Sequence, residues 1–139
     1  MTEEHTKHLY AKYPELFRQH TLGSNESCMC WGFDCGDGWF NIIDMMCAAI
    51  TNHYKYNAKD KKGNLIPCNV EFSQIKEKMG SARFYYDGGD SFTEGVVWLA
   101  EAMSERTCET CGASAKIRAK KGWLACVCAS CDNLPTPSA

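Results

Sequence analysis

Four cysteines near the end of the chain have the residue type and the spacing of a structural metal site. Cys108 and Cys111 form one C-x2-C pair, and Cys128 and Cys131 form a second pair after an interval of 16 residues. Because two residues separate the thiols of each pair, both sulfurs of a tight turn can point the same way, and two pairs can hold a tetrahedral Zn²⁺. Gly112 supplies the permissive backbone that such a turn needs. The spacing predicts a C-terminal zinc ribbon.

The other cysteines have no complete ligand pattern of their own. Cys126 is an alternative ligand because it lies two residues before Cys128, although the C-x2-C pairing is geometrically cleaner. A further cluster of three thiols falls within eight residues and comprises Cys28, Cys30 and Cys35. A second metal site there would need a fourth ligand from elsewhere, and the alternative is a set of buried thiols in an aromatic loop. The N-terminus has no export signal, so we expect metal-bound and free thiols rather than disulfides.

Composition and charge are those of a soluble globular chain. Of the 139 residues, 45% are hydrophobic and 23% are charged, as in ordinary globular domains. The net charge of −2 gives no overall attraction to nucleic-acid phosphates. No apolar run approaches the roughly 18 residues of a membrane span, so we expect no membrane partner.

Two helical stretches are expected in the first half of the chain. Residues 3–20 read as a broken helix, with Pro14 at the first turn of a short second helix that reaches Arg18. A clearer helix starts at Asp37, whose carboxylate can cap it. Its apolar side chains recur at intervals of three and four residues and comprise Trp39, Ile42, Ile43, Met46, Cys47, Ile50 and Tyr54.

A β-hairpin and a third helix are expected next. Apolar and polar residues alternate within residues 66–87, which predicts a β-hairpin with a bulge near Ser73–Gln74 and a turn at Gly80–Ser81. Ser91 to Glu94 reads as a capping box for a helix that ends near Ser104. The apolar face of that helix is predicted to comprise Phe92, Val96, Leu99, Ala100 and Met103.

These elements predict an α+β fold in which helices pack on a small antiparallel hairpin or sheet, with a C-terminal zinc ribbon. The expected division is a body at 1–104, a zinc-ribbon module at 105–133 that packs on the body, and an extended tail at 134–139.

Several sequence blocks resemble those of a group of small bacteriophage proteins. The blocks are 31–39 (WGFDCGDGW), 70–80 (VEFSQIKEKMG) and 83–90 (RFYYDGGD), together with the cysteine pairs and the intervening Gly122–Trp123–Leu124. The similarity covers about residues 12–131. In the group the last ligand is often His, and Cys131 replaces it here without loss of a four-ligand site. The resemblance implies a phage protein in the cytoplasm of an infected host, and it implies no activity.

Two pairs of aspartates are candidates for chemistry. Asp34 with Asp37, and Asp87 with Asp90, lie beside glycines at the ends of elements. If the pairs faced each other across a cleft, their carboxylates could bind Mg²⁺ or act as acid and base. The alternative is that Asp37 and Asp90 only cap the helices that follow them.

A basic segment inside the ribbon is the second candidate. Lys116, Arg118, Lys120 and Lys121 precede Trp123, a pattern that a nucleic-acid-binding ribbon would show. The same pattern is typical of a solvated hairpin edge, where lysines discourage association between sheets. The acidic net charge favours the solvated edge.

Aromatic side chains form the third candidate, a surface for another protein. Residues 84–86 are three aromatics in succession. Because successive residues of a strand face opposite sides of the sheet, at least one of these rings must face away from the core. An exposed Tyr85 beside Trp31 could anchor a partner, because such residues dominate interface energies. The alternative is that the N-terminal helices cover every ring.

From these features we predict a non-enzymatic phage accessory protein, a zinc-stabilised binder of a host defence or regulatory protein in the host cytoplasm. The expected partner-binding residues are Trp31, Asp34, Asp37, Tyr85, Asp87 and Asp90. One alternative is a zinc-ribbon nucleic-acid-binding protein in phage transcription or replication. A second is a small metal-dependent hydrolase built on the paired aspartates.

Overall fold

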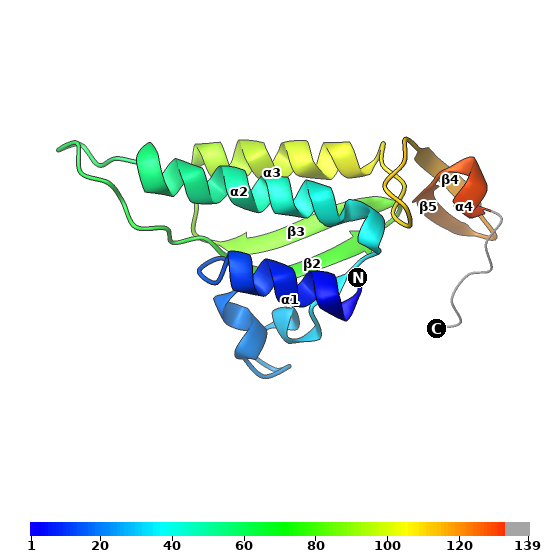
Figure 1. Cartoon of the computed structure of the whole chain (residues 1–139), viewed down its shortest axis with the longest axis horizontal. Coiled ribbons are helices and arrows are strands. Elements are labelled where there is room, and N and C mark those ends of the chain that lie inside the picture. The colour runs from blue at the N-terminus through cyan, green and yellow to red at the C-terminus, as the bar shows by residue number, and fades with distance from the viewer. Residues whose placement is uncertain (133–139) are drawn as a thin grey trace.

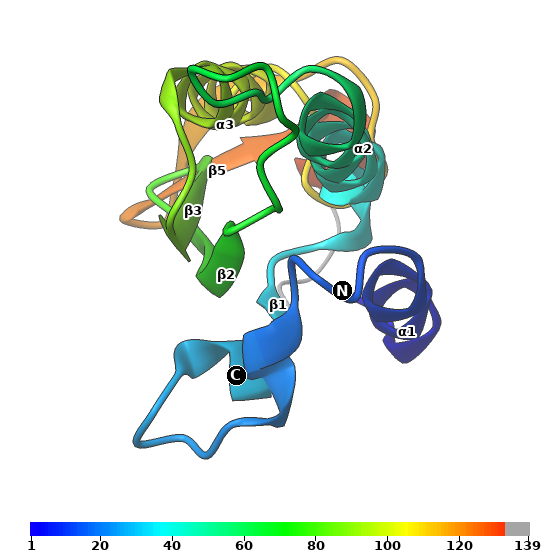
Figure 2. The same cartoon turned by 90° about the vertical axis from the view of Figure 1, so that its left-hand side faces the viewer.

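The computed structural model describes residues 1–132, so the predicted tail at 134–139 lies outside the described residues. Two helices, α2 (Phe40–Tyr56) and α3 (Ser91–Ser104), lie side by side over one face of a three-stranded sheet. Two short 3-10 helices (Arg18–Thr21 and Cys28–Trp31) lie on the other side, and α1 (Glu3–Lys12) lies beside α2, which it contacts through His5 and Lys12 (Figures 1 and 2). A metal module, residues 105–132, follows α3. The mixed helix-and-sheet architecture was predicted.

The sheet has the order β1-β2-β3, so the predicted hairpin supplies the central strand and one edge strand. Strand β2 (Glu71–Lys78) pairs with β3 (Ser81–Asp87) in antiparallel register, with the expected bulge between Phe72 and Gln74. The turn falls at Met79–Gly80, one residue before the predicted position, and both residues have positive φ, as a two-residue type I′ hairpin requires. The short β1 (Phe33–Asp34) adds to β2 in parallel.

The free edge of β3 is covered by side chains of α3. The Ser104 hydroxyl accepts a hydrogen bond from the Ala82 amide at 2.8 Å, and the Glu101 carboxylate accepts one from the Phe84 amide at 3.2 Å. These contacts satisfy edge donors that would otherwise attract another strand.

The core lies between the sheet and the two helix layers. The predicted face of α2 is buried throughout, and Trp39, in the 3-10 turn (Asp37–Trp39) that leads into α2, is fully buried. On the other face, Phe17 stacks on Phe72 with ring centroids 5.5 Å apart, and the Phe72 amide donates to the Leu16 carbonyl at 2.8 Å. The N-terminal segment is therefore tied to the central strand by both apolar and backbone contacts.

Several local predictions are wrong in detail. Helix α1 ends at Lys12, and the segment from Pro14 forms turns rather than a second helix. Asp37 does not cap a helix, because its carboxylate accepts a hydrogen bond from the Thr2 amide at 2.7 Å instead. The cap of α3 is Asp90, whose carboxylate accepts from the Thr93 amide at 3.0 Å; this confirms the capping interpretation of Asp90, whereas the capping box predicted at Ser91 is wrong.

The predicted apolar face of α3 is also wrong in part. The side chains that α3 buries are Thr93, Val97, Ala100 and Ser104. Phe92, Leu99 and Met103, which we expected inside, are exposed. The reason is that α3 is apolar on nearly every side, so periodicity alone could not select the buried face.

The metal module consists of a hairpin, β4 (Lys116–Lys120) and β5 (Trp123–Val127), and the one-turn helix α4 (Ala129–Asp132). It packs on the turn before α2 rather than on α3 alone. The Gly38 amide donates to the Glu109 carbonyl at 2.7 Å, and Trp39 Nε1 donates to the Thr107 carbonyl at 2.8 Å. A Cβ at Gly38 would lie 2.0 Å from the Cys108 carbonyl oxygen. Only glycine therefore permits this approach.

Candidate metal centre

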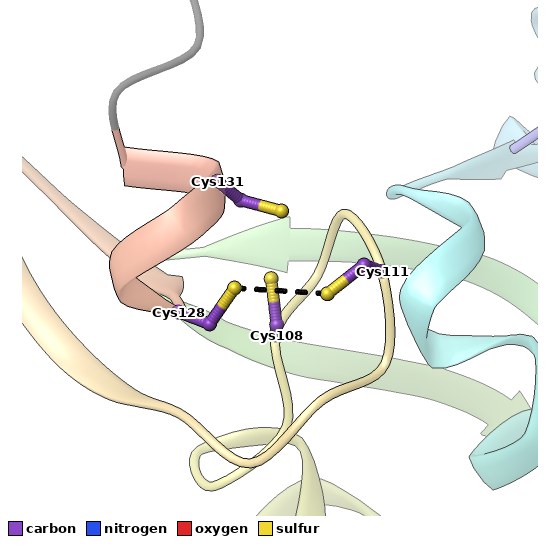
Figure 3. A group of neighbouring side chains, drawn as sticks. All are labelled: Cys108, Cys111, Cys128 and Cys131. Atoms are coloured by element: carbon purple, nitrogen blue, oxygen red, sulfur yellow. Dashed lines mark hydrogen bonds between the residues drawn. The ribbon is translucent and has the colours of Figure 1, made fainter.

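The four predicted cysteines come together at one end of the metal module. The sulfurs of Cys108, Cys111, Cys128 and Cys131 all lie within 4.8 Å of one another (Figure 3). The Sγ atoms of Cys111 and Cys128 are 3.7 Å apart. A tetrahedral site with bonds of about 2.3 Å places its sulfurs about 3.8 Å apart. The cluster thus has the dimensions of a four-thiolate metal site.

Two short backbone structures position these sulfurs. In the first, Gly112 has a φ of +81° and its amide donates to the Cys108 carbonyl at 2.9 Å, which closes the turn that carries Cys108 and Cys111. In the second, Cys128 precedes α4 and Cys131 lies within it, and the Asp132 amide donates to the Cys128 carbonyl at 2.9 Å. Figure 3 shows the two structures facing each other.

The pKa values of the four thiols show that they compete for negative charge, and a bound cation would relieve this competition. Burial disfavours the Cys108 thiolate, but backbone amides of Cys128, Cys111 and Thr110 outweigh burial and lower its pKa to about 6. The Cys131 amide likewise lowers the pKa of Cys128. Hydrogen bonding to the sulfurs of Cys128 and Cys111 raises the pKa of Cys131 to about 12. A divalent cation would remove this competition, because it compensates the charge of four adjacent thiolates.

All four positions of such a site are filled by protein sulfur, which is typical of a structural rather than a catalytic metal. Cys126 does not join the cluster. It is fully buried in the core and pairs with Ile117 of β4, whereas Cys128 lies beyond the end of β5.

No second metal-competent cluster occurs within residues 1–132. Cys28 is exposed, Cys30 is half-buried and Cys35 is buried. Burial raises the pKa of Cys35 to about 12, which makes it an unreactive thiol at neutral pH. The expectation of buried thiols therefore holds for Cys35 alone.

The two aspartate pairs do not face each other. Asp34 pairs across the sheet with Lys76 of β2, whereas Asp87 pairs with Glu71 of the same strand. Five residues along a strand span about 17 Å.

The second member of each pair confirms this separation. Asp37 lies just before α2, 3.1 Å from His5 Nδ1, whereas Asp90 is 2.7 Å from His53 near the other end of α2. The intervening 16 residues of helix span about 24 Å. The structure thus contradicts the shared carboxylate site, which the hydrolase alternative requires.

The two predicted aromatic anchors, Trp31 and Tyr85, are exposed. Because the two aspartate pairs lie apart, the anchors cannot form one site with both pairs. Trp31 exposes 74% of its surface at the end of the second 3-10 helix. Tyr85 exposes 43%, and the ammonium of Lys76 lies 5.9 Å from its ring centroid. Tyr85 lines a shallow groove with Cys28 and the loop before it, residues 24–27. Their role in partner binding stays a prediction.

The basic surface of the β4–β5 hairpin is confined to the metal module. Lys116, Arg118 and Lys120 alternate on one face of β4, and Trp123 pairs with Lys120 across the hairpin. Lys120 lines a cleft of about 810 Å³ between the module and the body. The body contributes Asp34, Asp37 and Glu77 to the lining of that cleft, and the module itself adds Glu109. The basic face therefore does not continue onto the body.

An apolar groove that the sequence did not predict lies between α2 and α3. It has a volume of about 270 Å³ and is lined by Asn41, Ile42, Met45, Met46, Ala49, Val96, Leu99, Ala100 and Met103. The signal that could have identified it is the composition of α3, which has only two charged residues, Glu94 and Glu101, among 14.

No helix within residues 1–132 is long and apolar enough to cross a membrane. Comparisons of the chain with protein families, with curated proteins and with solved structures found no match.

Proposed function

We propose that the chain is a phage accessory protein that binds a host protein stoichiometrically, as a counter-defence inhibitor does, and that Zn²⁺ stabilises its C-terminal module. One observation carries the binding role. Three of the four tryptophans are on the surface, with exposed fractions of 74% for Trp31, 72% for Trp98 and 77% for Trp123. Exposed tryptophan is uncommon on a protein without partners and is the residue type most enriched at interface hot spots.

Zinc is the ion that the ligand set favours. Four thiolates in a tetrahedral arrangement select zinc among the common divalent ions, because calcium and magnesium prefer oxygen ligands. Since all four ligands come from the protein, we assign the ion a structural role.

The phage origin and the host cytoplasm rest on two supports. The first is the resemblance of residues 12–131 to small bacteriophage proteins. The second is that all ten cysteines are free or in the metal cluster, which suits a reducing compartment.

The host partner is expected on one of two separate surfaces. One is centred on Trp31 with the exposed Asp34, and the other on Tyr85 with the exposed Asp87. Both combine an aromatic ring with a nearby carboxylate, and both lie on elements away from the outer side of α2 and α3. The carboxylates of Asp37, Asp87 and Asp90 each already accept a hydrogen bond within the fold, which makes them less suited to direct contact.

The test begins with tagged protein captured from phage-infected host cells. A host protein identified in this way is purified and titrated with the wild type, Trp31→Ala, Tyr85→Ala and the control Trp123→Ala. We expect Trp31→Ala or Tyr85→Ala to weaken binding by at least about 2 kcal/mol, or roughly 30-fold, with metal content unchanged. Equal binding by all four proteins, or no direct binding, would refute the proposal.

A nucleic-acid-binding role is the second candidate, favoured by the hairpin tip. Trp123 is exposed beside Lys120 and Lys121, so a base could stack on the indole while the lysines contact phosphates. If this role is correct, binding of an oligonucleotide will weaken steeply with salt and Trp123→Ala will abolish it. A salt-independent or absent interaction would leave the protein-binding role.

A further inference from the structure

We infer that the outer side of α2 and α3 is an interface between two copies of this chain. We call this surface the α2–α3 face and define it as the groove residues Met45, Ala49, Val96, Leu99 and Met103. Phe92 and Trp98 extend it along α3. The inference is independent of the proposed host partner, which we place on elements at the other side of the sheet.

The α2–α3 face is a contiguous apolar surface rather than a set of scattered side chains. Met45 exposes 67% of its surface, Leu99 56% and Met103 48%, and all three line one groove. Of the residues that line this groove, Asn41 is the only polar one. Figures 1 and 2 show α2 and α3 side by side above the sheet, and no other element of residues 1–132 covers their outer side. Contiguous apolar surface of this kind marks an interaction site.

The area of the face matches the requirement of a dimer. Five large side chains with exposed fractions between 43% and 72% contribute to it, namely Met45, Phe92, Trp98, Leu99 and Met103. If each loses about 100 Å² and the smaller neighbours add a similar amount together, one copy buries roughly 600 Å². Two copies then bury roughly 1,200 Å², which is the lower limit of stable, specific interfaces.

No charged residue lines the groove: Glu101 and Asp44 are directed elsewhere, and the exposed Glu94 lies outside the groove lining. Glu101 of α3 turns toward the sheet edge, where it accepts a hydrogen bond from the Phe84 amide. Asp44 of α2 turns toward α1, where Lys12 Nζ lies 2.9 Å and Tyr13 Oη 2.6 Å from the carboxylate. This arrangement matters because each chain has a net charge of −2, and like charges across an interface are costly.

The geometry of the helix pair fits a symmetric contact. Helices α2 and α3 run antiparallel and leave a groove between two ridges, one carrying Met45 and the other Leu99. A two-fold axis through the groove would place the ridge of each copy in the groove of the other, as ridges-into-grooves packing requires. Methionine at the contact can adjust to the fit, because its unbranched side chain fills irregular gaps.

The test is the oligomeric state of the purified, metal-loaded full chain. Sedimentation equilibrium over a range of protein concentrations should give twice the chain mass of 15.6 kDa for the wild type. Leu99→Glu and Met45→Glu should each raise the dimer dissociation constant by at least about 100-fold, because the dimer would bury two unpaired carboxylates. Both positions are exposed in the single chain, so circular dichroism and metal content should not change.

The matched control is Met79→Glu, which adds the same charge at a 66% exposed methionine in the β2–β3 turn. It should leave the dimer intact. A wild type that stays monomeric at all concentrations would overturn the inference. So would a dimer that Leu99→Glu and Met45→Glu leave unchanged. If the wild type is monomeric and a host protein instead binds through Leu99, the face is a docking site for that partner and not for a second copy.

Discussion

The indole of Trp39 donates a hydrogen bond from Nε1 to the backbone carbonyl of Thr107 at 2.8 Å. Trp39 is fully buried in the core of the body, and Thr107 directly precedes Cys108, the first cysteine of the candidate metal centre. This contact therefore joins the folding of the body to the geometry of the metal centre. A change in either part should be measurable in the other.

Replacing Trp39 by Phe tests this connection. We expect the variant to lose about 2–4 kcal/mol of unfolding free energy, because it leaves a cavity and an unpaired Thr107 carbonyl. The metal affinity should also fall, since the turn before Cys108 loses an anchor. Chemical denaturation measures the first effect and chelator competition the second. Unchanged affinity in a destabilised variant would show that the two parts are independent.

The ligand set is tested by metal content. Wild-type protein and Cys126→Ala should each bind one Zn²⁺ per chain, because Cys126 is buried away from the cluster. Cys128→Ser should release the ion and unfold the metal module, since the binding energy of a structural zinc is folding energy. Elemental analysis and circular dichroism provide the measurements. Zinc loss in Cys126→Ala with retention in Cys128→Ser would mean that the ligands were assigned wrongly.

Replacing Gly38 by Ala tests how the metal module packs on the body, and Gly95→Ala in α3 is the matched control. Gly38→Ala should destabilise the protein by at least about 3 kcal/mol, because the added methyl group would meet the Cys108 carbonyl oxygen at 2.0 Å. Gly95→Ala in α3 should stabilise it by about 0.5–1 kcal/mol, because no atom lies within 4 Å of the new Cβ and alanine favours helix. Thermal unfolding of dilute protein distinguishes the two. Equal melting temperatures would contradict the close approach at Gly38.

Asp90 gives a prediction for pH. Burial alone would raise its pKa, but hydrogen bonds from the Thr93 amide and from His53 outweigh burial and lower it below the usual 3.8. A carboxyl whose pKa is lower in the folded state stabilises the fold above its unfolded pKa, and this contribution is lost as pH falls through the folded value. The wild type should therefore be more stable than Asp90→Asn at pH 6, and the difference should shrink steadily as the pH falls below the unfolded value of 3.8.

Asn is the suitable replacement because it can still cap α3 and removes only the charge. Both proteins lose metal in acid to the same extent, so the difference between their unfolding free energies isolates the carboxylate. A difference that persists unchanged at pH 3 would assign the effect to the cap rather than to the charge.

Local signals in the sequence were sufficient for α2, for the β2–β3 hairpin and for the cysteine cluster. The C-x2-C pairs identified all four cysteines of the cluster, because short turns bring the sulfurs of each pair together whatever surrounds them. The periodicity of α2 identified its buried face, and the reversed alternation after Phe72 located the bulge, because both follow from backbone geometry within a few residues.

Relations between distant segments were decided only by the tertiary structure. Asp34 and Asp87 look alike in the sequence, yet they pair with residues 76 and 71 at separate points along β2. The buried side of α3 depends on which side meets the sheet, and a helix that is apolar on nearly every side does not encode that choice. Sequence spacing therefore determined which sulfurs meet, because their turns are local. The separation of the carboxylates and the exposure of Leu99 and Met45 required the whole fold, because they depend on how elements pack.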